Sequence, residues 1–166
     1  MWIYLLRHGI AEDPQPGQSD DERALTEQGW RRLRRAAPAW SRLVGGIDVL
    51  VSSPLRRARE TATVLAEAGG FRGELRIDEG LVPGAAPALA LAMLEAELLS
   101  GTDSVAVVGH EPHLGYLLGT LLTGHPRVTV PFKKGMLVGL EATSPTSLAT
   151  GLRFTLTQKA AARLTD

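Results

Sequence analysis

The first apolar run of the chain constrains its fold more than any other feature. Residues 2–6 read Trp-Ile-Tyr-Leu-Leu, so both faces of an extended segment would be apolar. Residues 47–51, where only Asp48 is polar, and residues 105–108 repeat this pattern. Strands that are buried on both faces belong to parallel sheets, whose faces are covered by helices. The three runs therefore predict a parallel sheet within an α/β domain.

Segments with helical spacing separate these runs. Thr26 is expected to cap a helix whose apolar residues recur every three or four positions, and Pro38 is expected to kink or shorten it. Ser53 and Pro54 have the residue types that cap and begin a helix, which predicts a helix from about Pro54 to Ala68. The remaining expected elements are a short strand at 74–77, helices at 87–99 and from Pro112, two edge strands at 136–140 and 153–157, and a short tail or frayed helix at 160–166.

This order of elements predicts a three-layer α/β/α sandwich with a mainly parallel central sheet. The 166 residues fit a single domain, taken as residues 1–166. Lys plus Arg and Asp plus Glu both number 18, which argues against nucleic acid or an anionic membrane as a partner. The chain has no cysteine, so disulfides and thiolate zinc sites are excluded. No apolar run approaches the ~18 residues that span a bilayer, and a cytoplasmic protein is expected.

Polar side chains follow the ends of the expected strands. The first strand is followed by Arg7 and His8, the second by Ser52, Ser53 and Arg57, the third by Glu79, and the fourth by His110. The carboxyl ends of parallel strands share one edge of a sheet, so these groups are expected to line one crevice. Arginine matches phosphate oxygens with a planar fork, and a neutral imidazole nitrogen can attack phosphorus. The pattern indicates a site for a dianionic phosphate.

Several choices stay open on residue types alone. Arg57 is not distinguished from Arg56 or Arg59, and His113 and His125 are expected to be structural or exposed. A metal site on His110 and His113 is disfavoured, because Glu111-Pro112 between them breaks the helical two-histidine arrangement. Neither a phosphate-binding P-loop nor a serine-hydrolase elbow is present.

Four motifs in order resemble the histidine phosphatase superfamily. They are Leu-Leu-Arg-His-Gly at 5–9, Leu-Thr-Glu-Gln-Gly at 25–29, Ser-Ser-Pro-Leu-Arg-Arg-Ala-Arg-Glu-Thr-Ala at 52–62, and Val-Gly-His at 108–110. The resemblance covers residues 2 to about 123. The short chain and its Gly-His-Glu-Pro-His-Leu stretch at 109–114 look most like the small SixA-type phosphohistidine phosphatases.

The resemblance implies a role for each residue of the crevice. His8 would be the nucleophile that becomes transiently phosphorylated, while Arg7, Arg57 and His110 would hold the phosphoryl group. The arginine before Ala58 in the family pattern is Arg57, which selects it over its neighbours. No cofactor and no metal are implied.

The general acid is less defined. Family members often carry an acidic residue after the third strand, which makes Glu79 the first candidate, with Asp78 as its neighbour. A carboxyl group in that role would need a raised pKa to hold a proton at neutral pH. Ala11 and Glu12 stand where the mutase branch has Ser or Thr and Asn, which disfavours a mutase.

The sequence thus predicts a metal-independent phosphatase with a phosphohistidine intermediate. Phosphohistidine on a partner protein is the favoured substrate, and a small phosphomonoester is the alternative. A non-catalytic module that only binds phosphate ligands is the hypothesis from another class. Lys133 and Lys134 could add a cationic rim to the site or form a solvated turn, and the loop at 12–22 could close over a ligand.

Overall fold

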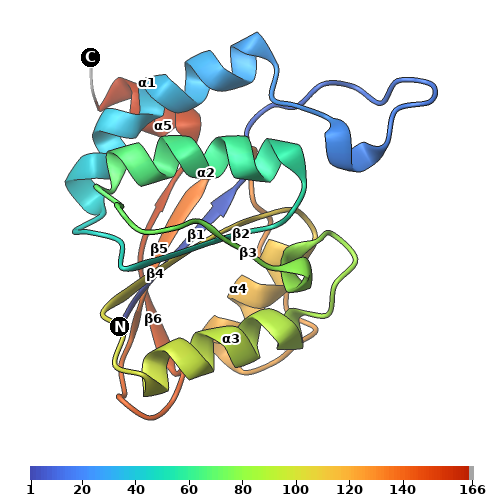
Figure 1. Cartoon of the computed structure of the whole chain (residues 1–166). Coiled ribbons are helices and arrows are strands. Elements are labelled where there is room, and N and C mark those ends of the chain that lie inside the picture. Colours follow the sequence, from blue (N-terminus) through green and yellow to red (C-terminus); the bar gives the residue numbers. More distant parts are fainter. Residues whose placement is uncertain (165–166) are drawn as a thin grey trace.

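The computed structural model describes residues 1–164, in which six strands form one central sheet (Figure 1). The strands are β1 (Trp2–Arg7), β2 (Val49–Ser52), β3 (Arg76–Ile77), β4 (Ser104–Gly109), β5 (Leu137–Ala142) and β6 (Thr150–Leu156), in the order β3-β2-β4-β1-β5-β6. The first four are parallel to one another, and β5 and β6 add an antiparallel edge beside β1. The expected mainly parallel sheet, with the last two strands at its far edge, is confirmed.

Helices cover both faces of this sheet (Figure 1). They are α1 (Glu27–Leu43), α2 (Arg56–Ala68), α3 (Pro87–Leu99), α4 (His113–Thr123) and α5 (Gln158–Arg163), with short 3-10 helices η1 (Asp20–Glu22) and η2 (Glu79–Leu81). Helices α1, α2 and α5 pack on one face, and α3 and α4 pack on the other. Two apolar clusters lie between the layers, centred on Trp40 and on Leu114. This is the predicted α/β/α sandwich.

Local capping explains where α1 begins. The Thr26 hydroxyl accepts a hydrogen bond from the Gly29 amide at 3.0 Å, as an N-cap residue does. A side chain at Gly29 would meet the Ile10 carbonyl oxygen at 2.2 Å, so glycine lets the helix approach the segment after β1. Pro38 does not shorten α1, which continues to Leu43.

Several expected boundaries are wrong, including those of the strands at 74–77, 136–140 and 153–157, which are β3 (Arg76–Ile77), β5 (Leu137–Ala142) and β6 (Thr150–Leu156). Helix α2 begins at Arg56 rather than Pro54, and Leu55 precedes it without a side-chain cap, so Ser53 is not an N-cap. Strand β2 covers Val49–Ser52 instead of 47–51. The segment expected to be a short tail or frayed helix at 160–166 contains the end of α5 (Gln158–Arg163), and its last two positions, 165 and 166, lie outside the described residues.

The register of the sheet brings the motif residues together. Arg7 pairs with Gly109, and Ser52 pairs with Val108, so β1, β4 and β2 end at the same level. The backbone continues this match beyond the strands, because the His8 amide donates to the Gly109 carbonyl at 3.0 Å. The sheet thus ends in a row of polar residues. Across residues 1–164, no helix is both long and apolar enough to cross a membrane.

Candidate active site

His8 is held in one protonation state directly after β1. Its Nδ1 lies 2.7 Å from the Gly9 carbonyl oxygen. A carbonyl only accepts, so Nδ1 carries the proton and Nε2 keeps a lone pair. Burial is the main cause that lowers the pKa of His8 to about 3. The positive charges of Arg57, Arg7 and Lys134 act in the same direction, and the hydrogen bond to Gly9 opposes them. The ring is therefore neutral at physiological pH, as a nucleophile must be.

His110 lies against His8 at the end of β4. The two ring centroids are 4.9 Å apart with planes tilted by 52°. His110 Nε2 is 2.8 Å from the hydroxyl of Ser53, a fully buried residue, which fixes the ring from the β2 side. Burial, followed by the charges of His8 and Arg57, lowers the pKa of His110 to about 2. Both imidazoles are thus neutral.

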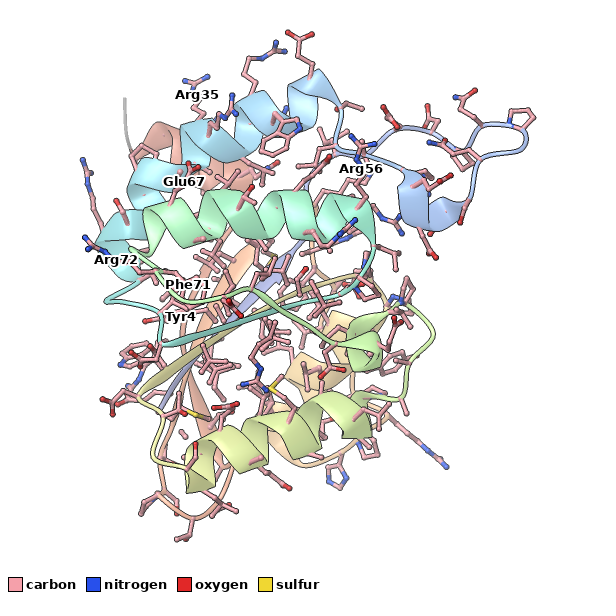
Figure 2. All side chains as sticks on the ribbon, viewed as in Figure 1. Tyr4, Arg35, Arg56, Glu67, Phe71 and Arg72 are labelled. Carbon is pink, nitrogen blue, oxygen red and sulfur yellow. The ribbon has the colours of Figure 1, made fainter. Side chains whose placement is uncertain are left out.

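Arg57 is the buried arginine in the first turn of α2, with 4% of its surface exposed. Its Nη1 donates to the Asp20 carbonyl at 2.7 Å, and its Nη2 donates to the Asp20 carboxylate at 2.8 Å. Arg56 instead lies exposed at the start of α2 (Figure 2), where its Nε donates to Glu60 at 2.8 Å. Arg59 is also exposed. Burial therefore distinguishes Arg57 from its neighbours, in agreement with the family pattern.

Asp20 belongs to the loop at 12–22, which carries η1 and projects beyond the N-terminal end of α2 (Figure 1). Its hydrogen bond with Arg57, supported by Arg23 at 2.5 Å, lowers the pKa of the Asp20 carboxyl group. The loop is thus anchored to a residue of the site. Residue types alone gave no signal for this contact.

Arg7 is oriented by the segment before β5. Its Nη1 donates to the Phe132 carbonyl oxygen at 2.6 Å, while its Nε is buried and has no partner among residues 1–164. The Phe132 amide donates to the Glu111 carboxylate, and the charge of Glu111 partly opposes the effect of burial, which lowers the pKa of Arg7. Glu111 thus holds the backbone amide of Phe132, the residue whose carbonyl oxygen orients Arg7.

The Ser-Pro-Leu-Arg-Arg-Ala-Arg-Glu-Thr-Ala motif also connects α2 to the segments around His8. The Thr61 hydroxyl donates to the Arg57 carbonyl at 2.7 Å and accepts from the Gly9 amide at 3.1 Å. Glu60 accepts from the Leu25 amide at 2.6 Å. The motif therefore fixes both the backbone beside His8 and the start of α1.

The expected acid after β3 forms fewer contacts than the quartet, the four residues expected to act on the phosphoryl group: Arg7, His8, Arg57 and His110. Glu79 is exposed, and its carboxylate has no hydrogen bond or ion pair to another residue of the described chain. Asp78 caps η2 through the Gly80 amide at 2.7 Å. Glu79 as the general acid stays a prediction.

His113 is buried rather than exposed, with 1% of its surface accessible. Neither of its ring nitrogens has a partner within residues 1–164. Burial lowers its pKa, against the charge of Asp78. Within the same residues, no group of three or more His, Asp or Glu side chains is arranged to hold a metal ion.

Comparisons with known proteins identify the family of this chain. The model of the histidine phosphatase superfamily (branch 1) matches residues 3–82. An uncharacterised protein of Picosynechococcus sp. is 32% identical over 142 residues, which cover 86% of each chain. The chain belongs to the histidine phosphatase superfamily. It is a phosphatase.

This histidine phosphatase is similar to SixA proteins. It is 29% identical over 124 residues to phosphohistidine phosphatase SixA of Escherichia coli, covering 75% of this chain and 76% of that protein. A solved structure of the protein histidine phosphatase SixA complexed with tungstate superposes with a TM-score of 0.86 at 24% identity, over 96% of this chain and 98% of that one. The fold is therefore SixA-like.

Proposed function

We propose that this phosphatase removes the phosphoryl group from phosphohistidine on a partner protein, through a phosphorylated His8 intermediate. The observation that carries the proposal is the state of the His8 ring. It is neutral, its proton is fixed on Nδ1 by the Gly9 carbonyl, and the positive charges of Arg7 and Arg57 act on it. A nucleophile and the groups that neutralise a phosphoryl dianion are thus adjacent.

The reaction has two in-line displacements at phosphorus. First, His8 Nε2 forms a bond to phosphorus while the bond from phosphorus to the substrate imidazole breaks, and that imidazole takes the electron pair and a proton from solvent. Water then attacks the phosphorus of phospho-His8, which releases inorganic phosphate and restores the ring. Arg7, Arg57 and His110 would hold the phosphoryl oxygens in both steps, so positioning and charge supply the catalysis without a metal or cofactor.

The preference for phosphohistidine rests on Asp20, the acidic residue that is bound to Arg57, whereas Glu79, the candidate general acid, is exposed and its carboxylate forms no hydrogen bond within residues 1–164. An ester needs a proton donor for its leaving oxygen, whereas an imidazole leaving group is protonated without one. The Asp20 carboxylate is bound to Arg57, which lowers its pKa and keeps it ionised at neutral pH. Asp20 is therefore unsuited to donate a proton. A phosphoramidate bond tolerates this site better than an ester does.

Kinetic assays on two substrates test the proposal. We expect purified protein to dephosphorylate a histidine-phosphorylated carrier protein with a higher kcat/KM than p-nitrophenyl phosphate. His8→Ala should reduce both rates to background, because no other group takes its place. His125→Ala is the matched control, since His125 is exposed and lies outside the quartet. Quenching in alkaline detergent should trap an acid-labile phosphoenzyme only when His8 is present.

Two outcomes would contradict the proposal. A higher kcat/KM for p-nitrophenyl phosphate would favour the small phosphomonoester as the substrate. Weak activity that is the same in His8→Ala, with no acid-labile phosphoenzyme, would favour a non-catalytic module that binds phosphate ligands.

A further inference from the structure

The turn formed by Lys133, Lys134 and Gly135 is fixed against the backbone of the candidate nucleophile. The Gly135 amide donates to the carbonyl oxygens of Arg7 and His8 at 3.0 and 3.1 Å. The Met136 amide closes the turn on the Lys133 carbonyl at 2.9 Å. The two lysines therefore project from a rigid support rather than from a free loop.

Gly135 makes this close approach possible. Its φ is +65°, in the left-handed region that favours glycine. A side chain there would meet Gln158 at 2.2 Å, so the turn also packs against α5. A larger residue at this position would have to move the turn away from Arg7 and His8.

Lys134 is the lysine of this turn that acts on the site. Its ammonium charge, together with those of Arg57 and Arg7, lowers the pKa of His8. Lys133 is also exposed, and its charge is not among those that lower the pKa of His8. Lys134 has no ion pair with any residue from 1 to 164, whereas Arg57 is bound to Asp20 and Arg7 to Phe132. It is thus a cation beside His8 without an anion of its own.

We propose that Lys134 forms a second anion subsite, which binds an acidic side chain next to the phosphohistidine of the partner protein. This inference rests on the proposed function and adds the feature that the enzyme would recognise around the phosphoryl group. The position proposed for the phosphoryl group is already surrounded by Arg7, His8, Arg57 and His110. Lys134 is exposed at the edge of this set, where a flexible stem lets its ammonium reach a group beside the phosphohistidine.

A carboxylate of the partner fits this position for a second reason. Arg7 and Arg57 carry two positive charges, which match the two negative charges of a phosphoryl group. Those two charges are taken up by the phosphoryl group, whereas Lys134 is exposed and has no ion pair with any residue from 1 to 164, so its charge stays available for a second anion. A single acidic side chain can pair with such a lysine without losing its own hydration, which is the usual condition of exposed ion pairs.

Binding to an inactive enzyme tests the subsite directly. The His8→Ala variant would be titrated with two phosphohistidine peptides that differ only in flanking residues, Glu on both sides or Gln on both sides. An exposed ion pair contributes about 0.2–1 kcal/mol, so we expect about 1.4- to 5-fold tighter binding of the Glu peptide. Adding Lys134→Glu should reverse this preference, and adding Lys133→Glu should leave it in place.

Each outcome decides the inference. Equal affinity for the two peptides in the His8→Ala protein, or equal loss of preference in the Lys133→Glu and Lys134→Glu variants, would overturn it. Turnover of both peptides by the wild type is a separate readout. If neither peptide is hydrolysed, the proposed function fails, whereas the binding preference still shows whether Lys134 recognises a flanking acid.

Discussion

Asp20 and Arg57 are joined by two hydrogen bonds, from Nη1 to the Asp20 carbonyl at 2.7 Å and from Nη2 to its carboxylate at 2.8 Å. The arginine that the family motif assigns to the phosphoryl group therefore already binds a carboxylate. The side chain of Asp20 is 54% exposed while that of Arg57 is 5% exposed, so the carboxylate is open to solvent and the guanidinium is buried. A phosphoryl dianion entering the site would compete with this carboxylate.

Asp20→Asn should strengthen anion binding. The substitution removes the negative charge but keeps the backbone carbonyl that orients Arg57. The pair is half exposed, so we expect the inhibition constant of inorganic phosphate to fall by about 2- to 5-fold. Asp21→Asn is the control, because Asp21 is exposed on the same turn and does not bind Arg57. Weaker inhibition by phosphate would mean that the carboxylate positions Arg57 instead of competing for it.

The stability of the protein should decrease in mild acid. Burial lowers the pKa of His8 to about 3 and that of His110 to about 2, whereas an unfolded histidine titrates near 6.5. Below pH 6.5 the unfolded chain therefore binds protons that the folded chain does not. Each histidine should reduce the free energy of unfolding by about 2 kcal/mol between pH 7 and pH 5.

Urea denaturation at the two pH values measures this decrease. His110→Asn should remove about half of the pH dependence assigned to this pair. His125→Asn, at an exposed position, should remove none of it. Unchanged stability between pH 7 and pH 5 would show that both rings keep an ordinary histidine pKa in the folded protein.

Ser53→Ala should harm both stability and activity. It leaves His110 Nε2 without its partner at 2.8 Å in a buried site, which costs about 1–3 kcal/mol of unfolding free energy. Release of the ring should also lower kcat/KM by about tenfold. Ser52→Ala is a matched control, because Ser52 is equally buried but its hydroxyl contacts only the Ser53 carbonyl. Equal kcat/KM in the two variants would rule out a role for Ser53 in orienting His110.

Glu111→Ala should reduce activity although Glu111 does not belong to the phosphoryl-binding quartet. Its carboxylate holds the Phe132 amide, and the Phe132 carbonyl holds Arg7 at 2.6 Å. We expect kcat/KM to fall by about tenfold as Arg7 loses its orientation. Glu111→Gln keeps an acceptor oxygen and should restore most of the rate. If both variants had the same low rate, the charge of Glu111 rather than its hydrogen bond would be responsible.

The elements that the sequence predicted best are rich in apolar residues along most of their length. The helix expected at 87–99 is α3 (Pro87–Leu99), and the run at 2–6 becomes β1 with one further residue. One wrong boundary lies at Ser53 and Pro54, before α2. There the residue types fit a helix cap, but the serine hydroxyl binds His110, which is 57 positions away in the chain. Local propensity could not anticipate a partner from another strand.

The sequence by itself determined the α/β/α architecture and the family, because burial patterns and motifs are local properties of the chain. Its motifs also named His8, Arg7, Arg57 and His110 as the candidate site. Only the tertiary structure decided what binds each of them: the Asp20 loop on Arg57, Phe132 on Arg7, and Ser53 on His110. These contacts join segments 37 to 125 residues apart, and they depend on how loops pass over the sheet edge rather than on any periodic pattern.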